Sequence, residues 1–123
     1  MNKFLLTLVF VFFTLPVWAL ELLMFNNKHC GYCSAFIEEV AVDYEYKDHK
    51  NKDLPLVIID AYNQPDWFRE AYKGNRIKGI FGTPTFIIWN GRKELARVVG
   101  YSTKDNFYRA LTELFPRDYF EKQ

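Results

Sequence analysis

Two short apolar runs, with a helical pattern between them, constrain the fold of this chain more than any other feature. Residues 22–25 are all apolar and have the length of a buried strand. In residues 31–44 the apolar side chains, among them Phe36 and Val40, can share one helical face. Residues 56–60 form a β-branched run that is typical of a buried strand in a parallel sheet. The first half therefore predicts a right-handed β-α-β unit.

The second half predicts a helix, a β-hairpin and a final helix. Residues 67–72 carry the apolar faces of the first helix, after a turn. Residues 85–89 and 94–99 have strand composition, and Asn90-Gly91 between them is typical of a tight hairpin turn. A serine or threonine at 102–103 can cap the last helix. The expected fold is α/β, in the order β-α-β-α-β-β-α, with a four-stranded mixed sheet flanked by helices.

Composition indicates one domain and excludes several classes of partner. The chain has 123 residues, of which half are hydrophobic and 19% aromatic, so it can build a packed core. Its formal net charge is only +1, so no strong basic field favours nucleic acid or a membrane surface. We expect no nucleic-acid partner. The chain shows no separate dimerisation domain, and we expect a monomer.

The N-terminus has the pattern of an export signal. Residues 1–19 combine a positive start, an apolar middle, a break at Pro16 and a small residue, Ala19, at a cleavage point. Cleavage there leaves a mature domain of residues 20–123. An uncleaved membrane anchor is the alternative, because the uncharged run 4–20 reaches the lower limit of about 17 residues for a spanning helix.

Cys30 and Cys33 are the only cysteines, and their spacing favours a reactive site over a structural disulfide. Closing so small a loop removes little entropy from the unfolded chain. A Cys-x-x-Cys pair between a strand and a helix in an α/β pattern predicts a redox motif. At the helix start, Cys30 faces unpaired N–H groups and the positive end of the helix dipole, which both favour its thiolate. Cys33 lies almost one turn later and is placed to resolve a mixed disulfide.

Four motifs over residues 22–114 resemble the thioredoxin superfamily: Cys30-Gly31-Tyr32-Cys33, Gly82-Thr83-Pro84-Thr85-Phe86, the Asn90-Gly91 hairpin and Val99-Gly100. The cysteine box is similar to that of bacterial periplasmic disulfide isomerases. The short, aromatic-rich chain resembles the small thioredoxin-like proteins that accompany periplasmic sulfur-oxidation systems. The resemblance implies a thioredoxin-like fold and a location in the periplasm. It also implies a redox-active disulfide between Cys30 and Cys33 as the redox centre, with no further cofactor.

The same resemblance implies roles for residues around the cysteines. The matching proline in thioredoxin folds is cis, so Pro84 is expected to face the cysteines and to present the backbone of Thr83 to an extended substrate. Independently of the resemblance, the Thr83 hydroxyl and a proton on His29, which replaces the tryptophan often found before the first cysteine, are expected to stabilise the Cys30 thiolate. Thioredoxins carry a buried acidic residue where this chain has Met24, so the proton relay used there is absent or replaced.

The expected activity is reduction or isomerisation of disulfides in a partner protein, with Cys30 attacking and Cys33 resolving. A membrane thiol donor is expected to keep the protein reduced. Neutral Gly31-Tyr32 adds no charge inside the motif, so the extreme thiolate stabilisation that makes a strong oxidant is not expected.

Two other classes of function remain open from the sequence. A soft pair of cysteines can hold copper(I), so a copper-carrying protein is one alternative. Structural zinc normally takes four protein ligands, and only His29 and His49 could add to the cysteines, so no metal site is expected. A redox-inert module that only binds a partner is the other alternative.

Overall fold

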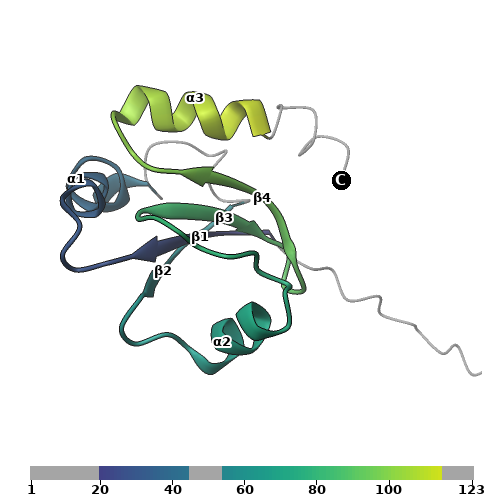
Figure 1. Ribbon diagram of the computed structural model, residues 1–123. Helices are drawn as coiled ribbons and strands as arrows, with labels where there is room; N and C mark the ends of the chain where they lie inside the picture. The colour runs from purple at the N-terminus through teal and green to yellow at the C-terminus, as the bar shows by residue number, and fades with distance from the viewer. Residues whose placement is uncertain (1–19, 45–53, 115–123) are drawn as a thin grey trace, which may run out of the picture.

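The computed structural model of the chain describes residues 20–44 and 54–114 (Figure 1). Its elements are β1 Glu21–Asn26, α1 Gly31–Glu39, the 3-10 helix η1 Ala41–Asp43, β2 Leu56–Asp60, α2 Asp66–Lys73, β3 Thr85–Trp89, β4 Glu94–Val99 and α3 Lys104–Leu114. Apart from η1, this is the order that the sequence predicts. The α/β class and the four-stranded mixed sheet are confirmed.

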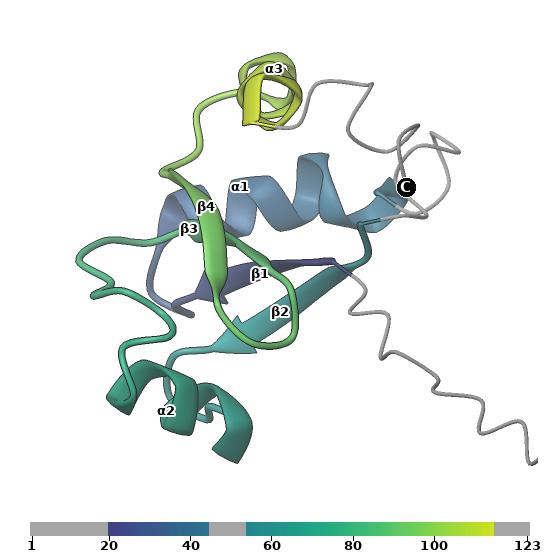
Figure 2. The same cartoon turned by 90° about the vertical axis from the view of Figure 1, so that its right-hand side faces the viewer.

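The sheet has the strand order β2-β1-β3-β4. The inner strand β1 pairs in parallel with β2, where Leu23 lies opposite Val57, and antiparallel with β3, where Leu23 lies opposite Ile87. β3 and β4 pair antiparallel as a hairpin. Helices α1 and α3 lie on one face of the sheet and α2 on the other, as Figures 1 and 2 show. The two inner strands are therefore covered on both faces, which explains their continuous apolar runs.

Side chains of the inner strands alternate between two cores, one on each face of the sheet, as the pleat of a strand requires. The core under α1 and α3 takes Leu22, Met24, Phe86 and Ile88. The core above α2 takes Leu23, Ile87 and Trp89.

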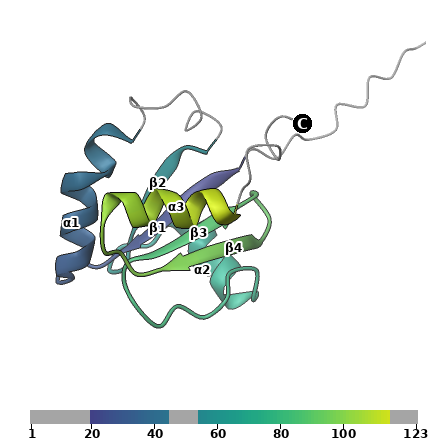
Figure 3. The same cartoon turned by 90° about the horizontal axis from the view of Figure 1, so that it is seen from above.

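An aromatic cluster joins α1 and α3 to the sheet. Phe36 of α1 packs against Phe86 of β3 and Phe107 of α3, with ring centroids 4.6 and 5.0 Å away. The rings of Phe86 and Phe107 are themselves 4.9 Å apart. In the view from above, α3 lies across the middle of the sheet and α1 lies next to one end of it, at the left (Figure 3). This packing fixes the first turn of α1 beyond the end of β1, where the cysteines lie.

The hairpin has the strand bounds that the sequence predicts, 85–89 and 94–99, and residues 90–93 join the two strands. The Asn90 N–H donates to the Lys93 carbonyl at 3.3 Å. The Asn90 side-chain oxygen accepts hydrogen bonds from the N–H groups of Arg92 and Lys93, at 2.9 and 2.8 Å. Gly91 takes the left-handed φ of 87° that such a loop needs. The Asn-Gly pair therefore lies in the turn, as expected, and the Asn90 side chain stabilises it.

Thr103 caps α3, since its hydroxyl oxygen accepts the Asn106 N–H at 3.2 Å. Over the described parts of the chain, no helix has both the length and the apolar character needed to cross a membrane. The expected signal of residues 1–19 and the second histidine, His49, lie outside the described residues.

Candidate active site

A short turn between β1 and α1 places Cys30 directly before the start of α1. The Cys30 N–H donates to the Asn27 carbonyl at 3.0 Å, and the Asn27 side-chain oxygen accepts the His29 N–H at 2.9 Å. Cys30 itself keeps an extended backbone, with φ −98° and ψ 114°, and is the N-cap residue of α1. Because the first N–H groups of a helix lack partners within the helix, its sulfur lies where such donors converge.

The Cys30 sulfur has two hydrogen-bond partners that come from different parts of the fold. The backbone N–H of Cys33 donates to it at 3.2 Å, as in a helix N-cap. The Cys30 thiol donates in turn to the carbonyl oxygen of Thr83 at 3.3 Å. The second contact joins α1 to the segment before β3, so the sulfur lies between two walls of the fold.

Cys33 is the buried member of the pair. Its side chain is 1% exposed and packs in the core under α1 and α3, whereas Cys30 is only partly buried. Both thiols are free, so the structure describes the reduced state. Cys30 is therefore the more accessible of the two thiols, and the division between an attacking and a resolving cysteine stays a prediction.

The surroundings shift the pKa values of the two thiols in opposite directions. Partial burial raises the pKa of Cys30, but hydrogen bonds from the side chains of Cys33 and Thr83 and from the N–H groups of Cys33 and Tyr32 outweigh it, so the pKa lies below its ordinary value. Burial dominates at Cys33 and raises the pKa of that thiol. At neutral pH, the accessible thiol is therefore the one that ionises more readily.

The wall opposite the cysteines is the proline loop, which we define as residues 78–84. Its last peptide bond, Thr83–Pro84, is cis, the isomer that the resemblance implies. The Pro84 carbonyl accepts the Gly100 N–H at 2.8 Å, which ties the end of the loop to the end of β4. The buried hydroxyl of Thr85 donates to the Gly82 carbonyl at 2.6 Å.

Arg97 of β4 holds the other end of the proline loop. Its guanidinium donates to the carbonyls of Gly79 at 2.8 Å and Lys78 at 3.0 Å. The same group forms a bidentate ion pair with Glu94, whose side chain is only 4% exposed. The pair and its two carbonyl contacts form a polar clamp on the loop.

A β-bulge makes this clamp possible. Trp89 pairs with Glu94 and Ile88 with Ala96, so Leu95 is an extra residue on β4. Residues three apart on a regular strand point to opposite faces, but the extra residue shifts this alternation by one. Glu94 and Arg97 therefore lie on the same face of the sheet. Sequence reasoning missed both residues, because no local signal marks the bulge.

The comparison with known families decides the assignment. Residues 21–115 match the family described as the thioredoxin-like domain, which is most of the chain. The chain belongs to this family. Its strand order, the cysteine pair at the start of α1 and the cis peptide bond at Pro84 fit that membership.

Solved thioredoxin structures share this fold. The periplasmic thioredoxin SoxS of Paracoccus pantotrophus, in its reduced form, is 26% identical with a TM-score of 0.63, and the match covers 77% of this chain and 94% of that one. A thioredoxin of Malassezia sympodialis is 17% identical with a TM-score of 0.58, covering 78% and 75%. A mutant thioredoxin of Halobacterium salinarum is 21% identical with a TM-score of 0.53, covering 78% and 74%. A search of curated protein sequences finds no match.

The thioredoxin-like fold brings together Cys30, Cys33 and Thr83, and Pro84 follows Thr83 directly. The His29 ring lies edge-on to the Tyr62 ring, with the centroids 6.0 Å apart, and its expected influence on the Cys30 thiolate stays a prediction. Within residues 20–44 and 54–114, no three His, Cys, Asp or Glu side chains are grouped as a metal site. Met24, at the position of the acidic residue in thioredoxins, is fully buried.

Proposed function

We propose that this chain is a periplasmic thiol–disulfide oxidoreductase that reduces or isomerises disulfides of a partner protein. The thioredoxin-like fold and the Cys-x-x-Cys pair support a thiol–disulfide oxidoreductase in general. The contact set of the Cys30 sulfur supports the proposal most directly. One accessible thiol with a lowered pKa lies at a helix start, three residues before a buried thiol with a raised pKa.

The proposed reaction has two steps. The Cys30 thiolate attacks one sulfur of the substrate disulfide, and the other substrate sulfur leaves as a thiolate. Cys33 then gives up its proton and attacks the Cys30 sulfur, which breaks the mixed disulfide and forms the Cys30–Cys33 disulfide. The second substrate sulfur also leaves as a thiolate, and the two substrate thiolates take up protons. Two electrons pass from the cysteine pair to the substrate, and a membrane thiol donor restores the reduced pair.

Thr83 and Pro84 are proposed to dock the substrate chain. In the reduced protein, the Cys30 thiol donates a hydrogen bond to the Thr83 carbonyl. Once Cys30 is a thiolate or part of a mixed disulfide, it has no proton to donate, and this carbonyl becomes available to an N–H of an extended substrate. Loss of the thiol proton thus favours β-type pairing beside the reacting sulfur.

The proposed location rests on two observations. The N-terminal pattern is that of an export signal, and a periplasmic thioredoxin is among the similar structures. We propose that the mature protein acts there as a monomer on a protein disulfide, with the cysteine pair as its redox centre and no other cofactor.

The decisive experiment compares Cys30→Ser and Cys33→Ser with the unchanged protein in reduction of glutathione disulfide and insulin. Cys30→Ser is expected to abolish exchange, because it removes the attacking thiol. Cys33→Ser is expected to accumulate mixed disulfides on non-reducing gels, because nothing resolves them. Equal trapping by both variants, or by neither, contradicts the assigned roles. A copper carrier would instead show stoichiometric copper(I) binding in an anaerobic titration and no disulfide reduction.

A further inference from the structure

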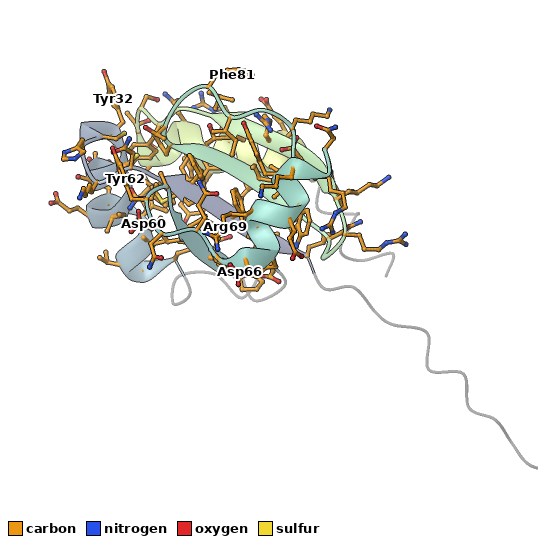
Figure 4. The ribbon with its side chains drawn as sticks, turned by 60° about the horizontal axis from the view of Figure 1, so that its bottom comes forward. Tyr32, Asp60, Tyr62, Asp66, Arg69 and Phe81 are labelled. Carbon is orange, nitrogen blue, oxygen red and sulfur yellow. The ribbon has the colours of Figure 1, made fainter. Side chains whose placement is uncertain are left out.

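Phe81 is the most exposed large apolar side chain in the described part of the chain, with 98% of its surface accessible. It lies two residues before Thr83, whose carbonyl accepts the Cys30 thiol. Two residues span at most about 7 Å of chain, so the ring is kept near the reactive sulfur. Figure 4 shows Phe81 along the same upper edge of the molecule as Tyr32, which follows Cys30 by two residues. A fully exposed phenylalanine contributes almost nothing to folding, so its ring is available to contact a partner beside the active site.

The loop that carries Phe81 is fixed on both sides of the ring. Before it, Arg97 binds the carbonyls of Lys78 and Gly79. After it, the Thr85 hydroxyl binds the Gly82 carbonyl at 2.6 Å. Because the backbone on both sides of the ring is anchored, little backbone freedom is lost when the side chain binds a partner.

Gly79 leaves room for the ring of Phe81. A Cβ atom at this glycine would lie 2.9 Å from Cζ and 3.0 Å from Cε2 of Phe81, closer than side-chain atoms approach each other. The ring therefore lies beside Gly79, and a larger residue at this position would displace it.

Two further aromatic side chains extend the apolar surface around Cys30. Tyr32 is 67% exposed and Tyr62 is 63% exposed. The Tyr62 ring is held between the His29 ring, 6.0 Å away, and the Lys28 ammonium, 5.1 Å from its centre. Exposed aromatic residues next to a binding centre are the usual source of contact energy in protein recognition.

We infer that Phe81 determines specificity, by packing against a large apolar side chain that lies within about two residues of the reactive cysteine in the substrate. The inference rests on the proposed function and adds the class of substrate to it. A substrate strand paired with Thr83 advances about 3.3 Å per residue, so the residue two positions from its cysteine lies about 7 Å along the strand, and Phe81 lies two residues along the loop from Thr83.

Two synthetic peptides, each used as its disulfide-linked dimer, test this. Each contains one cysteine in a glycine-rich sequence; one has leucine two positions before and after the cysteine, and the other has serine there. The reduced protein releases peptide thiol from each dimer, and a second-order rate constant is measured for each peptide. The readout is the rate constant for the leucine peptide divided by that for the serine peptide. A general change in reactivity cancels in this ratio.

The unchanged protein is expected to prefer the leucine peptide by about tenfold, the factor that corresponds to about 1.4 kcal/mol. Phe81→Ser is expected to reduce the ratio to about twofold or less, and Phe81→Leu to restore part of it. Gly79→Ala, which displaces the ring, is expected to give an intermediate ratio. The matched control is Tyr72→Ser, which removes a 42% exposed aromatic residue on α2 and is expected to keep the ratio of the unchanged protein.

The outcomes separate the inference from the function on which it rests. A protein that reduces both peptides equally, or a Phe81→Ser variant that keeps the preference, overturns the inference and leaves the proposed function intact. A protein that reduces neither peptide overturns both. A second copy of this chain could contact Phe81 in place of a substrate, and sedimentation of the unchanged and Phe81→Ser proteins tests this. A dimer that dissociates on substitution would assign Phe81 to a contact between copies and overturn the inference.

Discussion

The start of α1 and the proline loop face each other across the Cys30 sulfur, yet different interactions hold them. Phe36 packs the cysteine side into an aromatic cluster with Phe86 and Phe107. The proline loop has some apolar packing, because Ile80 contacts the core on the α2 face, but the polar clamp of Arg97 and Glu94 also binds its backbone carbonyls. One wall is therefore part of the aromatic core, and the other combines a contact with the second core and directed hydrogen bonds from the edge strand β4.

The difference has a consequence for function. Apolar packing is shared among many residues, so it positions the thiols only as long as the whole domain is folded. A polar clamp acts through a few directed bonds, and it can be loosened without unfolding the sheet. We expect substitutions in the cluster to change global stability, and substitutions in the clamp to change the docking wall first.

Phe36→Ala is expected to give the largest loss of stability, because it empties the centre of the aromatic cluster. The side chain is fully buried, and truncation of such a phenylalanine costs about 3–5 kcal/mol. Urea denaturation followed by circular dichroism measures the change. The matched control is Phe81→Ala, at the exposed phenylalanine, for which no change above about 0.5 kcal/mol is expected. A loss below about 1 kcal/mol for Phe36→Ala would refute the role of the cluster.

Arg97→Ala is expected to cost less stability and to change peptide selectivity more. It leaves the Glu94 carboxylate buried without its partner and frees two carbonyls of the proline loop, a loss of about 1–3 kcal/mol. The preference of this variant for the leucine peptide over the serine peptide should also decrease, because the loop that carries Phe81 is no longer held. The control is Arg69→Ala, which removes an exposed pair with Asp66 on α2 and should cost at most about 0.5 kcal/mol. Unchanged selectivity in Arg97→Ala would show that the loop is held without the clamp.

Tyr44→Phe is expected to cost about 1 kcal/mol, since it removes a buried hydrogen bond to the Leu54 carbonyl at 2.8 Å. Burial also raises the pKa of the Tyr44 hydroxyl. The unfolded chain then loses this proton first, so stability is complete below the ordinary tyrosine pKa of about 10 and falls above it. Denaturation at pH 9 and pH 11 should show a smaller alkaline loss for Tyr44→Phe. Equal losses in both proteins would contradict the assignment.

The smallest expected effect is that of thiol ionisation on the stability of the reduced protein. The lowered pKa of Cys30 adds stability as the pH rises toward the ordinary pKa of a thiol, and the raised pKa of Cys33 removes it above that value. The reaction with iodoacetamide distinguishes the ionisation of Cys30 from that of Cys33. The pH dependence of the modification rate should have its midpoint below the ordinary thiol pKa for Cys30, and Cys33 should react only at higher pH. His29→Gln should move the Cys30 midpoint upward if the imidazole tunes the thiolate. A Cys30 midpoint at or above the ordinary value refutes the thiolate argument.

Most of the fold and one wall of the site could be predicted from local sequence patterns. The apolar runs of β1, β2 and β3 and the cysteine spacing at the start of α1 are properties of short segments, so the sequence expresses them directly. The resemblance supplied Thr83 and Pro84. Arg97 and Glu94 could not be found in this way, because their common face depends on a bulge at Leu95.

The position of Phe81 also depended on tertiary structure. The loop that carries it is held by carbonyl contacts with Arg97, a residue of β4 that lies 18 and 19 positions from its partners. The local sequence around Phe81 does not contain this contact. By contrast, the Asn90 side chain bonds only to its own loop, and the sequence predicts this hairpin correctly.

The contact between the Cys30 thiol and the Thr83 carbonyl joins residues 53 positions apart. β3 follows Thr83 almost at once and must pair with β1 before this carbonyl can reach the sulfur. During synthesis, a nascent chain that ends before Thr83 carries both cysteines and lacks this acceptor, so the contact cannot form. The redox chemistry of this domain therefore starts late, when a contact of long sequence separation closes. Until then the motif is present and the active site is not.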